Sequence, residues 1–95
     1  MPAYVVFTRE KMRNQEAYDR YRPKARAALE GQPAKALVRY GRHETIEGAP
    51  IDGAVILEFP TFEAAKAWYN SPAYTEARQD RHLGGDYRAF IVEGL

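Results

Sequence analysis

Cysteine is absent from this 95-residue sequence. The chain therefore has no disulfide framework, no thiolate ligands for a metal and no thiol nucleophile. Long apolar runs are missing as well, and none approaches the roughly 20 residues of a membrane-spanning helix. The first ten residues lack a charged segment followed by an apolar core, so we expect no secretory signal. These absences favour a cytoplasmic protein with no membrane partner.

A strong excess of one charge is also missing. Fourteen Lys and Arg against thirteen Asp and Glu give a net charge of +1, too small for whole-molecule attraction to nucleic acid. The charges are unevenly placed, because residues 9–26 contain seven basic and three acidic side chains. That segment is either a solvated helix face or a surface that steers an anionic ligand. No Gly-rich loop follows a strand-like segment, so we expect no phosphate cradle for a nucleotide.

Aromatic side chains are what the sequence has in quantity. They make up 13% of the residues and include seven tyrosines. Hydrophobic residues at 45% and charged residues at 28% are ordinary for a folded protein, and the length allows one core. We therefore expect residues 1–95 to form a single domain. Tyrosine has an apolar ring and a polar tip, which suits interfaces and pocket walls.

Short apolar segments alternate with amphipathic ones along the chain. We expect strands at 3–8 (AYVVFT), 34–40 (AKALVRY), 53–59 (GAVILEF) and 87–92 (YRAFIV), with 44–47 as a further extended segment.

Two helical regions lie between these strands. Apolar and small residues recur at helical spacing from Asn14, a candidate N-cap, to Glu30, ahead of Gly31 as a stop. Pro23 lies inside this helix and predicts a kink or a division into two short helices. The second region begins after Thr61, and Ser71 followed by proline restarts it.

The order strand, helix, strand, strand, helix, strand is that of the split βαβ plan. It predicts a ferredoxin-like α+β fold, a four-stranded antiparallel sheet with its helices on one face. A sheet with one wet face should alternate apolar and polar residues. Residues 5–7 and 55–57 are instead consecutive apolar side chains, so both faces need cover. We therefore predict a homodimer in which two sheets pack face to face with the helices outside.

Six short segments carry a family resemblance. They are LVR at 37–39, EG at 47–48, LEFPT at 57–61, AA at 64–65, WYNSPAY at 68–74 and IVEG at 91–94. Together they resemble the domain-of-unknown-function family 1330, over essentially the whole chain. The resemblance implies a dimeric α+β barrel, a superfamily that includes cofactor-independent monooxygenases, muconolactone isomerases, polyketide cyclases and haem enzymes of the chlorite dismutase type. It implies no particular reaction, since fold does not fix function.

This chain departs from the family pattern at two places. Members usually follow the arginine of the second strand with Gly-Gly, whereas here Arg39 is followed by Tyr40-Gly41. His43 then stands where the family has no fixed histidine. These changes mark either an altered pocket or a specialised subgroup.

We expect a cavity between the helix layer and the sheet, beneath the bend at Pro23. The candidates to line it from the helices are Tyr18, Tyr21, Trp68, Tyr69 and Tyr74. These side chains either orient a phenolic or enolic substrate or pack in the core with their hydroxyls at solvent or a carbonyl.

His43 and Tyr69 are the candidate acid-base residues. His43 follows the second strand and can titrate near neutral pH, although a loop histidine can equally be a surface residue. His82 is expected to interact with the end of the last helix. Two isolated histidines without a carboxylate pattern do not form a metal site, and we expect no cofactor.

Arg39 has three interpretations. It forms an ion pair with Glu58, it binds an anionic ligand, or it lies in solvent; Arg88 is an alternative partner of Glu58.

The leading hypothesis is a small homodimer that binds an aromatic or carbonyl-bearing metabolite between helices and sheet. Cofactor-independent acid-base chemistry of the isomerase, cyclase or monooxygenase kind would suit these residues. The alternative is a noncatalytic ligand-binding or interaction module.

Overall fold

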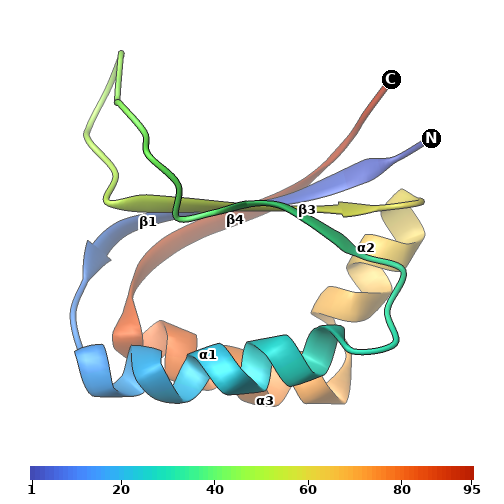
Figure 1. Cartoon of the computed structure of the whole chain (residues 1–95), viewed down its shortest axis with the longest axis horizontal. Helices are drawn as coiled ribbons and strands as arrows, with labels where there is room; N and C mark the ends of the chain where they lie inside the picture. Colours follow the sequence, from blue (N-terminus) through green and yellow to red (C-terminus); the bar gives the residue numbers. More distant parts are fainter.

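The computed structural model describes all 95 residues as four strands and three helices (Figure 1). The strands are β1 (Ala3–Met12), β2 (Lys35–Arg39), β3 (Gly53–Phe59) and β4 (Gly85–Glu93), and the helices are α1 (Gln15–Leu29), α2 (Phe62–Tyr69) and α3 (Pro72–Gly84). The elements follow the predicted order, with the second helical region divided into α2 and α3. The expected ferredoxin-like α+β fold is confirmed.

All four strands join one antiparallel sheet in the order β2-β3-β1-β4. The three helices cover one face of this sheet, and the β2–β3 loop projects away from them beyond the other face (Figure 1). The expected extended segment at 44–47 is wrong, because residues 41–50 contain neither helix nor strand. Gly48, with a φ of 85°, and Pro50 interrupt the strand pairing there.

Side-chain caps begin each helix where the sequence predicts them. The Asn14, Thr61 and Ser71 side chains accept hydrogen bonds from the backbone N–H three residues ahead, at 3.0 to 3.3 Å. The predicted division of the first helix at Pro23 is wrong, since α1 is one continuous helix. Arg20 before the proline and Lys24 after it both contact Asp80 of α3, at 3.3 and 2.7 Å, so α3 supports α1 on both sides of Pro23.

The core lies between the inner face of the sheet and the helix layer. Trp68 of α2 and Tyr74 of α3 stack with ring centroids 4.2 Å apart, and Phe59 of β3 lies 5.5 Å from Trp68. All three are almost fully buried. α2 is the helix that approaches the sheet, whereas α1 packs mainly along α3. This arrangement leaves space between α1 and the sheet.

A row of apolar side chains crosses the outer face of the sheet through all four strands. Val38 pairs with Ile56, Ile56 with Val6, and Val6 with Phe90, which makes one continuous row. Phe90 and the nearby Val92 are each about half exposed. As the consecutive apolar residues of β1 and β3 predict, apolar side chains lie on both faces of the sheet.

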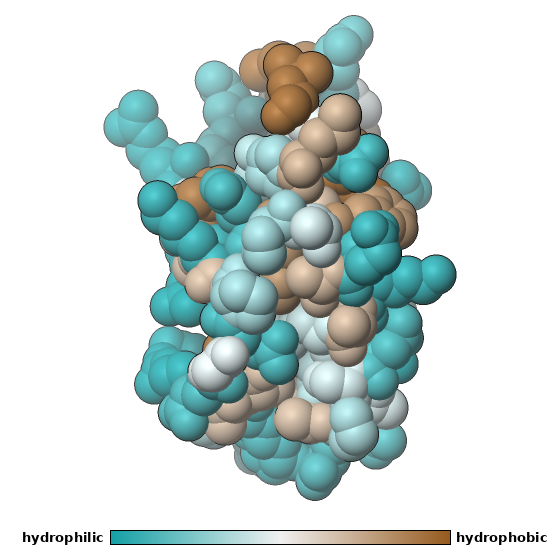
Figure 2. Space-filling model, turned by 90° about the vertical axis from the view of Figure 1, so that its right-hand side faces the viewer, coloured by the Kyte–Doolittle hydropathy of each residue, from teal (hydrophilic) through white to brown (hydrophobic).

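Figure 2 shows the molecule from the side where both chain ends lie. Apolar brown surface gathers toward the top of that view, on the sheet side, while the helix layer below is mostly teal and pale. None of the helices combines the length and apolar character needed to cross a bilayer.

Candidate functional site

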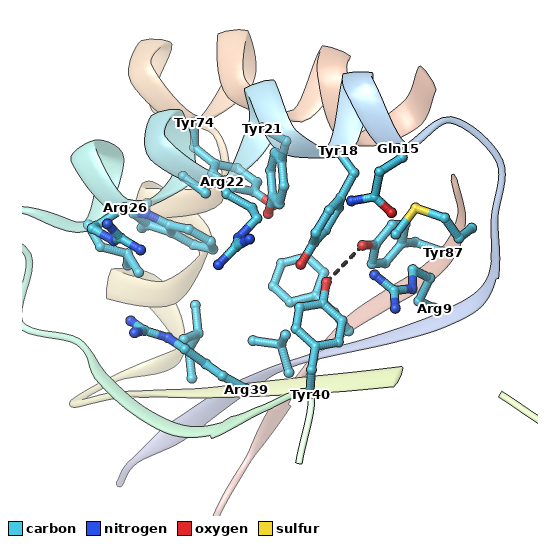
Figure 3. Close-up of a pocket in the computed structure, with 17 residues that line it drawn as sticks. Arg9, Gln15, Tyr18, Tyr21, Arg22, Arg26, Arg39, Tyr40, Tyr74 and Tyr87 are labelled. Atoms are coloured by element: carbon cyan, nitrogen blue, oxygen red, sulfur yellow. Dashed lines mark hydrogen bonds between the residues drawn. The ribbon is translucent and has the colours of Figure 1, made fainter. Parts of the chain in front are cut away.

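A cavity of about 520 Å³ lies between α1 and the inner face of the sheet (Figure 3). Its walls come from α1, from single residues of α2 and α3, and from the inward-facing residues of all four strands. Five of the residues predicted from the sequence line it: Tyr18, Tyr21, Arg39, Trp68 and Tyr74. The interior is largely apolar, as is usual for small-molecule sites.

A chain of hydrogen bonds runs from the protein interior to this cavity. The buried Arg81 donates from Nη1 to the Tyr74 hydroxyl at 3.3 Å, and the Tyr74 and Tyr21 hydroxyls lie 2.8 Å apart. Arginine has donors only, so Tyr74 must accept from Arg81. Whichever tyrosine donates to the other, one phenolic proton of the pair remains free. The pair therefore offers a donor to an acceptor in the cavity.

Burial keeps these two phenols protonated. It raises the pKa of Tyr21, and the neighbouring Tyr74 adds to the effect. Burial also raises the pKa of Tyr74, although Arg81 and the hydrogen bond with Tyr21 oppose it. At neutral pH both groups are hydrogen-bond donors rather than bases.

Arg81 is a buried cation without a carboxylate partner. It is 3% exposed, and its guanidinium lies over the rings of Phe7 and Tyr87 at 4.9 and 5.2 Å. These ring faces and the hydroxyls of Tyr69 and Tyr74 surround the charge in place of an acid. Arg81 therefore supplies positive potential behind the phenols.

A second pair of hydroxyls lies at the other end of the cavity. The Tyr40 and Tyr87 oxygens are 2.7 Å apart, marked by the dashed line in Figure 3. Arg9, held by an ion pair with Asp52, lies over the Tyr40 ring at 4.6 Å. Burial raises the pKa of both tyrosines. This end of the cavity is therefore also lined by neutral phenols.

Tyr40 is the one non-glycine residue with a positive φ, 52°. Its ring occupies the space beside Gly53, where an added Cβ would come within 2.5 Å of it. The ring also meets Tyr18 edge-on at 5.9 Å. A left-handed bulky residue carries backbone strain, so contacts with its neighbours must hold Tyr40 in place.

The two candidate acid-base residues do not line the cavity. His43 lies in the exposed β2–β3 loop, where its ring nitrogens are 3.3 and 3.1 Å from the Gly41 and Ile51 carbonyl oxygens. Tyr69 lies behind Tyr74, where burial would raise its pKa but the Arg78 and Arg81 cations outweigh that effect and lower it. The structure therefore separates both residues from the lining set.

His82 lies in the last turn of α3, the position that the sequence predicts, and its side chain is exposed. Its Nε2 lies 3.2 Å from Nη2 of Arg81. Partial burial and the Arg81 and Arg78 cations lower its pKa. No group of three or more His, Asp or Glu side chains is arranged to hold a metal ion.

The predicted ion pairs of Glu58 are wrong. Arg39 is in register with Val55 and faces the cavity, whereas Glu58 faces outward opposite Lys35. Arg88 pairs instead with Glu10, at 3.1 Å. The period-two alternation of the strands places Arg39 and Glu58 on opposite faces.

Several residues line the cavity that the sequence did not predict there. The chief ones are Arg9, Arg22, Arg26, Tyr40 and Tyr87. Arg22 and Arg26 are four residues apart on α1, a spacing that could have placed both on one helix face. Tyr87 lies two residues before Ala89 on the inward side of β4, a pattern that the strand alternation could have given.

The family model for the domain of unknown function DUF1330 matches residues 2–95. The chain belongs to the DUF1330 family. Comparison of this DUF1330 protein with curated protein sequences gives no match.

Solved structures share its fold at low sequence identity. A protein of unknown function from Rhodopseudomonas palustris is 20% identical with a TM-score of 0.75, and the match covers 99% of this chain and 82% of that one. A dimeric ferredoxin-like protein of unknown function from Thermobifida fusca is 11% identical, with a TM-score of 0.66 and coverage of 99% and 92%. A candidate antibiotic biosynthesis monooxygenase from Nitrosomonas europaea is 12% identical, with a TM-score of 0.60 and coverage of 99% and 89%. At these identities the similarities establish the fold of the DUF1330 protein alone.

Proposed function

We propose that this DUF1330 protein binds a small aromatic or carbonyl-bearing metabolite in the cavity between α1 and the sheet. The observation that carries the proposal is the lining itself, an apolar interior with two pairs of tyrosine hydroxyls. A volume of about 520 Å³ lies within the range of small-molecule sites. Apolar walls with a few polar groups favour a ring-sized ligand with one or two oxygen acceptors.

The chemistry that this lining supports is activation of a carbonyl or enolate oxygen. Tyr21 and Tyr74 stay protonated, and Arg81 behind them favours negative charge on an oxygen that they contact. We assign the donor role to Tyr21 and Tyr74 rather than to His43 and Tyr69, because His43 and Tyr69 do not line the cavity. Such donors suit isomerase, cyclase or cofactor-independent monooxygenase chemistry.

One observation favours noncatalytic binding as the second candidate. The lining contains no His, Asp or Glu, so no side chain in the cavity is a ready general base. A substrate that must lose a proton would need a base of its own or from elsewhere. Conversion of a bound compound by the wild-type protein, lost in Tyr21→Phe, would support catalysis; binding without any conversion would favour the noncatalytic candidate.

A matched pair of variants on α1 tests the cavity. Ala25 lines it, whereas Ala27 is exposed on the same helix. A thermal-shift screen of small aromatic and carbonyl compounds should find ligands that raise the melting temperature of wild type and of Ala27→Phe. Ala25→Phe should abolish the shift, because the new ring occupies the binding space. At 100-fold excess over Kd the stabilisation should be about 2.7 kcal/mol.

Two outcomes of this screen would contradict the proposal. Ligands that stabilise Ala25→Phe as well as wild type would bind elsewhere, and the cavity would not be the site. A screen in which no compound stabilises wild type would count against a ligand-binding function.

We also propose that two copies pair through the outer faces of their sheets. The row Val38, Ile56, Val6 and Phe90 gives an apolar surface that no element of the chain covers. The neighbour from Thermobifida fusca is described as dimeric, which supports this arrangement. The cavity lies on the opposite, inner side of the sheet, so this pairing does not cover it. Light scattering should give the mass of a dimer at micromolar concentration; a monomer would refute the pairing.

A further inference from the structure

The cavity is lined by four arginines and by no carboxylate. One of them, Arg9, is already paired with Asp52. Arg22, Arg26 and Arg39 form no ion pair in the structure. Three cations without acidic partners therefore surround one apolar space.

These three side chains lie around the same end of the cavity. Arg22 and Arg26 descend from α1, and Arg39 rises from the end of β2 (Figure 3). Cations four residues apart on a helix repel each other, and Arg39 adds a third charge from across the opening. An anion bound among these three cations would offset their mutual repulsion.

Another face of the same helix shows the contrast. Arg20 and Lys24 are also four residues apart, but Asp80 of α3 lies between them and contacts both. Asp80 supplies the negative charge there. At the cavity the sheet offers Arg39 in the corresponding place, and no residue of the chain neutralises the cluster.

We infer that the ligand of this cavity is an organic anion, with an oxyanion group among Arg22, Arg26 and Arg39. Its apolar or aromatic body would lie against the interior walls, including Leu57 and Trp68. The inference rests on the proposed function and names the class of its ligand. A planar guanidinium group can donate two parallel hydrogen bonds to two oxygens of a carboxylate or a phosphate. Either head group would therefore fit the arginine cluster.

The chain carries its own reporter for this binding. Trp68 lines the cavity and is the sole tryptophan, so its indole N–H gives a single resonance in a ¹H–¹⁵N spectrum. We would titrate the protein with 4-hydroxycinnamate, with its uncharged amide and with phenyl phosphate, and follow this resonance. The carboxylate and the amide have nearly the same shape, so their comparison isolates the charge.

The acid should bind at least about tenfold more tightly than the amide, and added salt should reduce the difference. Arg22→Gln and Arg39→Gln should each bring the two affinities closer together. Arg20→Gln is the matched control: it removes one positive charge from the same helix outside the cavity, and it should keep the preference. All three positions are exposed, and the rest of the spectrum verifies that each variant is folded.

The outcomes separate the two proposals. Tighter binding of phenyl phosphate than of the acid would assign a phosphate head group. Tighter binding of the acid would assign a carboxylate head group. Either result supports an anionic ligand. Equal affinity for acid and amide, with the Trp68 resonance shifting in each case, would overturn the anionic class and leave the cavity as a binding site. No shift of cavity resonances with any of the three probes would count against both.

Discussion

Replacement of Phe90 by alanine should weaken the proposed dimer by about three orders of magnitude. Phe90 lies on the outer face of β4, opposite Val6, and is 52% exposed in the single chain. A phenylalanine presents roughly 200 Å², so about 100 Å² remains to be buried by a partner. At about 25 cal/mol per Å² that burial contributes about 2.5 kcal/mol, of which alanine would keep only a part.

The symmetry of the interface doubles this loss. A two-fold interface contains Phe90 twice, so the dimer should lose about 4 kcal/mol, close to a 1000-fold increase in Kd. Sedimentation velocity over a range of about 0.1 to 100 µM would measure the dissociation constant. Leu83→Ala is the control, because Leu83 is 61% exposed but lies on α3.

Two results would refute this reasoning. A Phe90→Ala protein whose dissociation constant matches that of Leu83→Ala would show that the outer sheet face is not the interface. A wild-type protein that remains monomeric at the highest concentration would remove the dimer altogether. Urea unfolding of both variants would show how much Phe90 contributes within one chain, where its cross-strand contact with Val6 is worth up to about 1 kcal/mol.

Three further predictions concern stability. The cavity phenols with raised pKa remain protonated in the folded protein above pH 10.0, the ordinary tyrosine value, while the unfolded chain loses those protons. In urea unfolding, the contribution of these groups to the free energy of unfolding should therefore be constant below about pH 10. Above that pH it should fall by up to about 1.4 kcal/mol per pH unit per phenol. A flat profile to pH 11 would contradict their burial. Gly84→Ala should lower the free energy of unfolding by about 1 to 3 kcal/mol, because the added Cβ comes within 3.1 Å of the Tyr18 backbone nitrogen. Gly41→Ala is the control: the space around Gly41 is open, so its free energy of unfolding should stay within about 0.5 kcal/mol of wild type. Equal effects would show that α1 can move away from α3. Ser71→Ala should cost about 1 kcal/mol through loss of the α3 cap, and calorimetry with an unchanged melting temperature would contradict that role.

The sequence was informative wherever one local rule decided the outcome. The strand from Gly53 to Phe59 is found with its predicted bounds, because a run of β-branched and apolar residues ends at a proline. Thr61 and Ser71 cap α2 and α3 for similarly local reasons. Tyr18 and Trp68 reach the cavity because helical spacing alone places them on inner faces.

Residues whose direction depends on tertiary structure were harder to predict. The sequence offers Glu58 as an ion-pair partner for Arg39, but the strand register places the two residues on opposite faces of the sheet. Tyr40 follows β2 in a left-handed conformation, and its ring lies beside Gly53 and meets Tyr18 edge-on, neither of which a local pattern predicts. Arg81 lies on the buried side of α3, and its phenolic surroundings depend on how α1, α3 and β4 meet.

The seven tyrosines occupy different parts of the fold. Five of them line the cavity: Tyr18, Tyr21, Tyr40, Tyr74 and Tyr87. Their rings form much of the wall, and four of their hydroxyls pair two by two. Of the other two, Tyr69 lies behind Tyr74, and Tyr4 lies on the outer sheet face beside the apolar row. The aromatic content is thus divided among cavity, core and outer face.

The most direct test of the account is a crystal structure of the protein grown with the compound that binds it most tightly. We expect electron density for that compound between α1 and the sheet, with an oxygen within hydrogen-bond distance of the Tyr21 hydroxyl. Density for the compound only at another surface, with α1 closed onto the sheet or solvent alone in the cavity, would contradict the central claim.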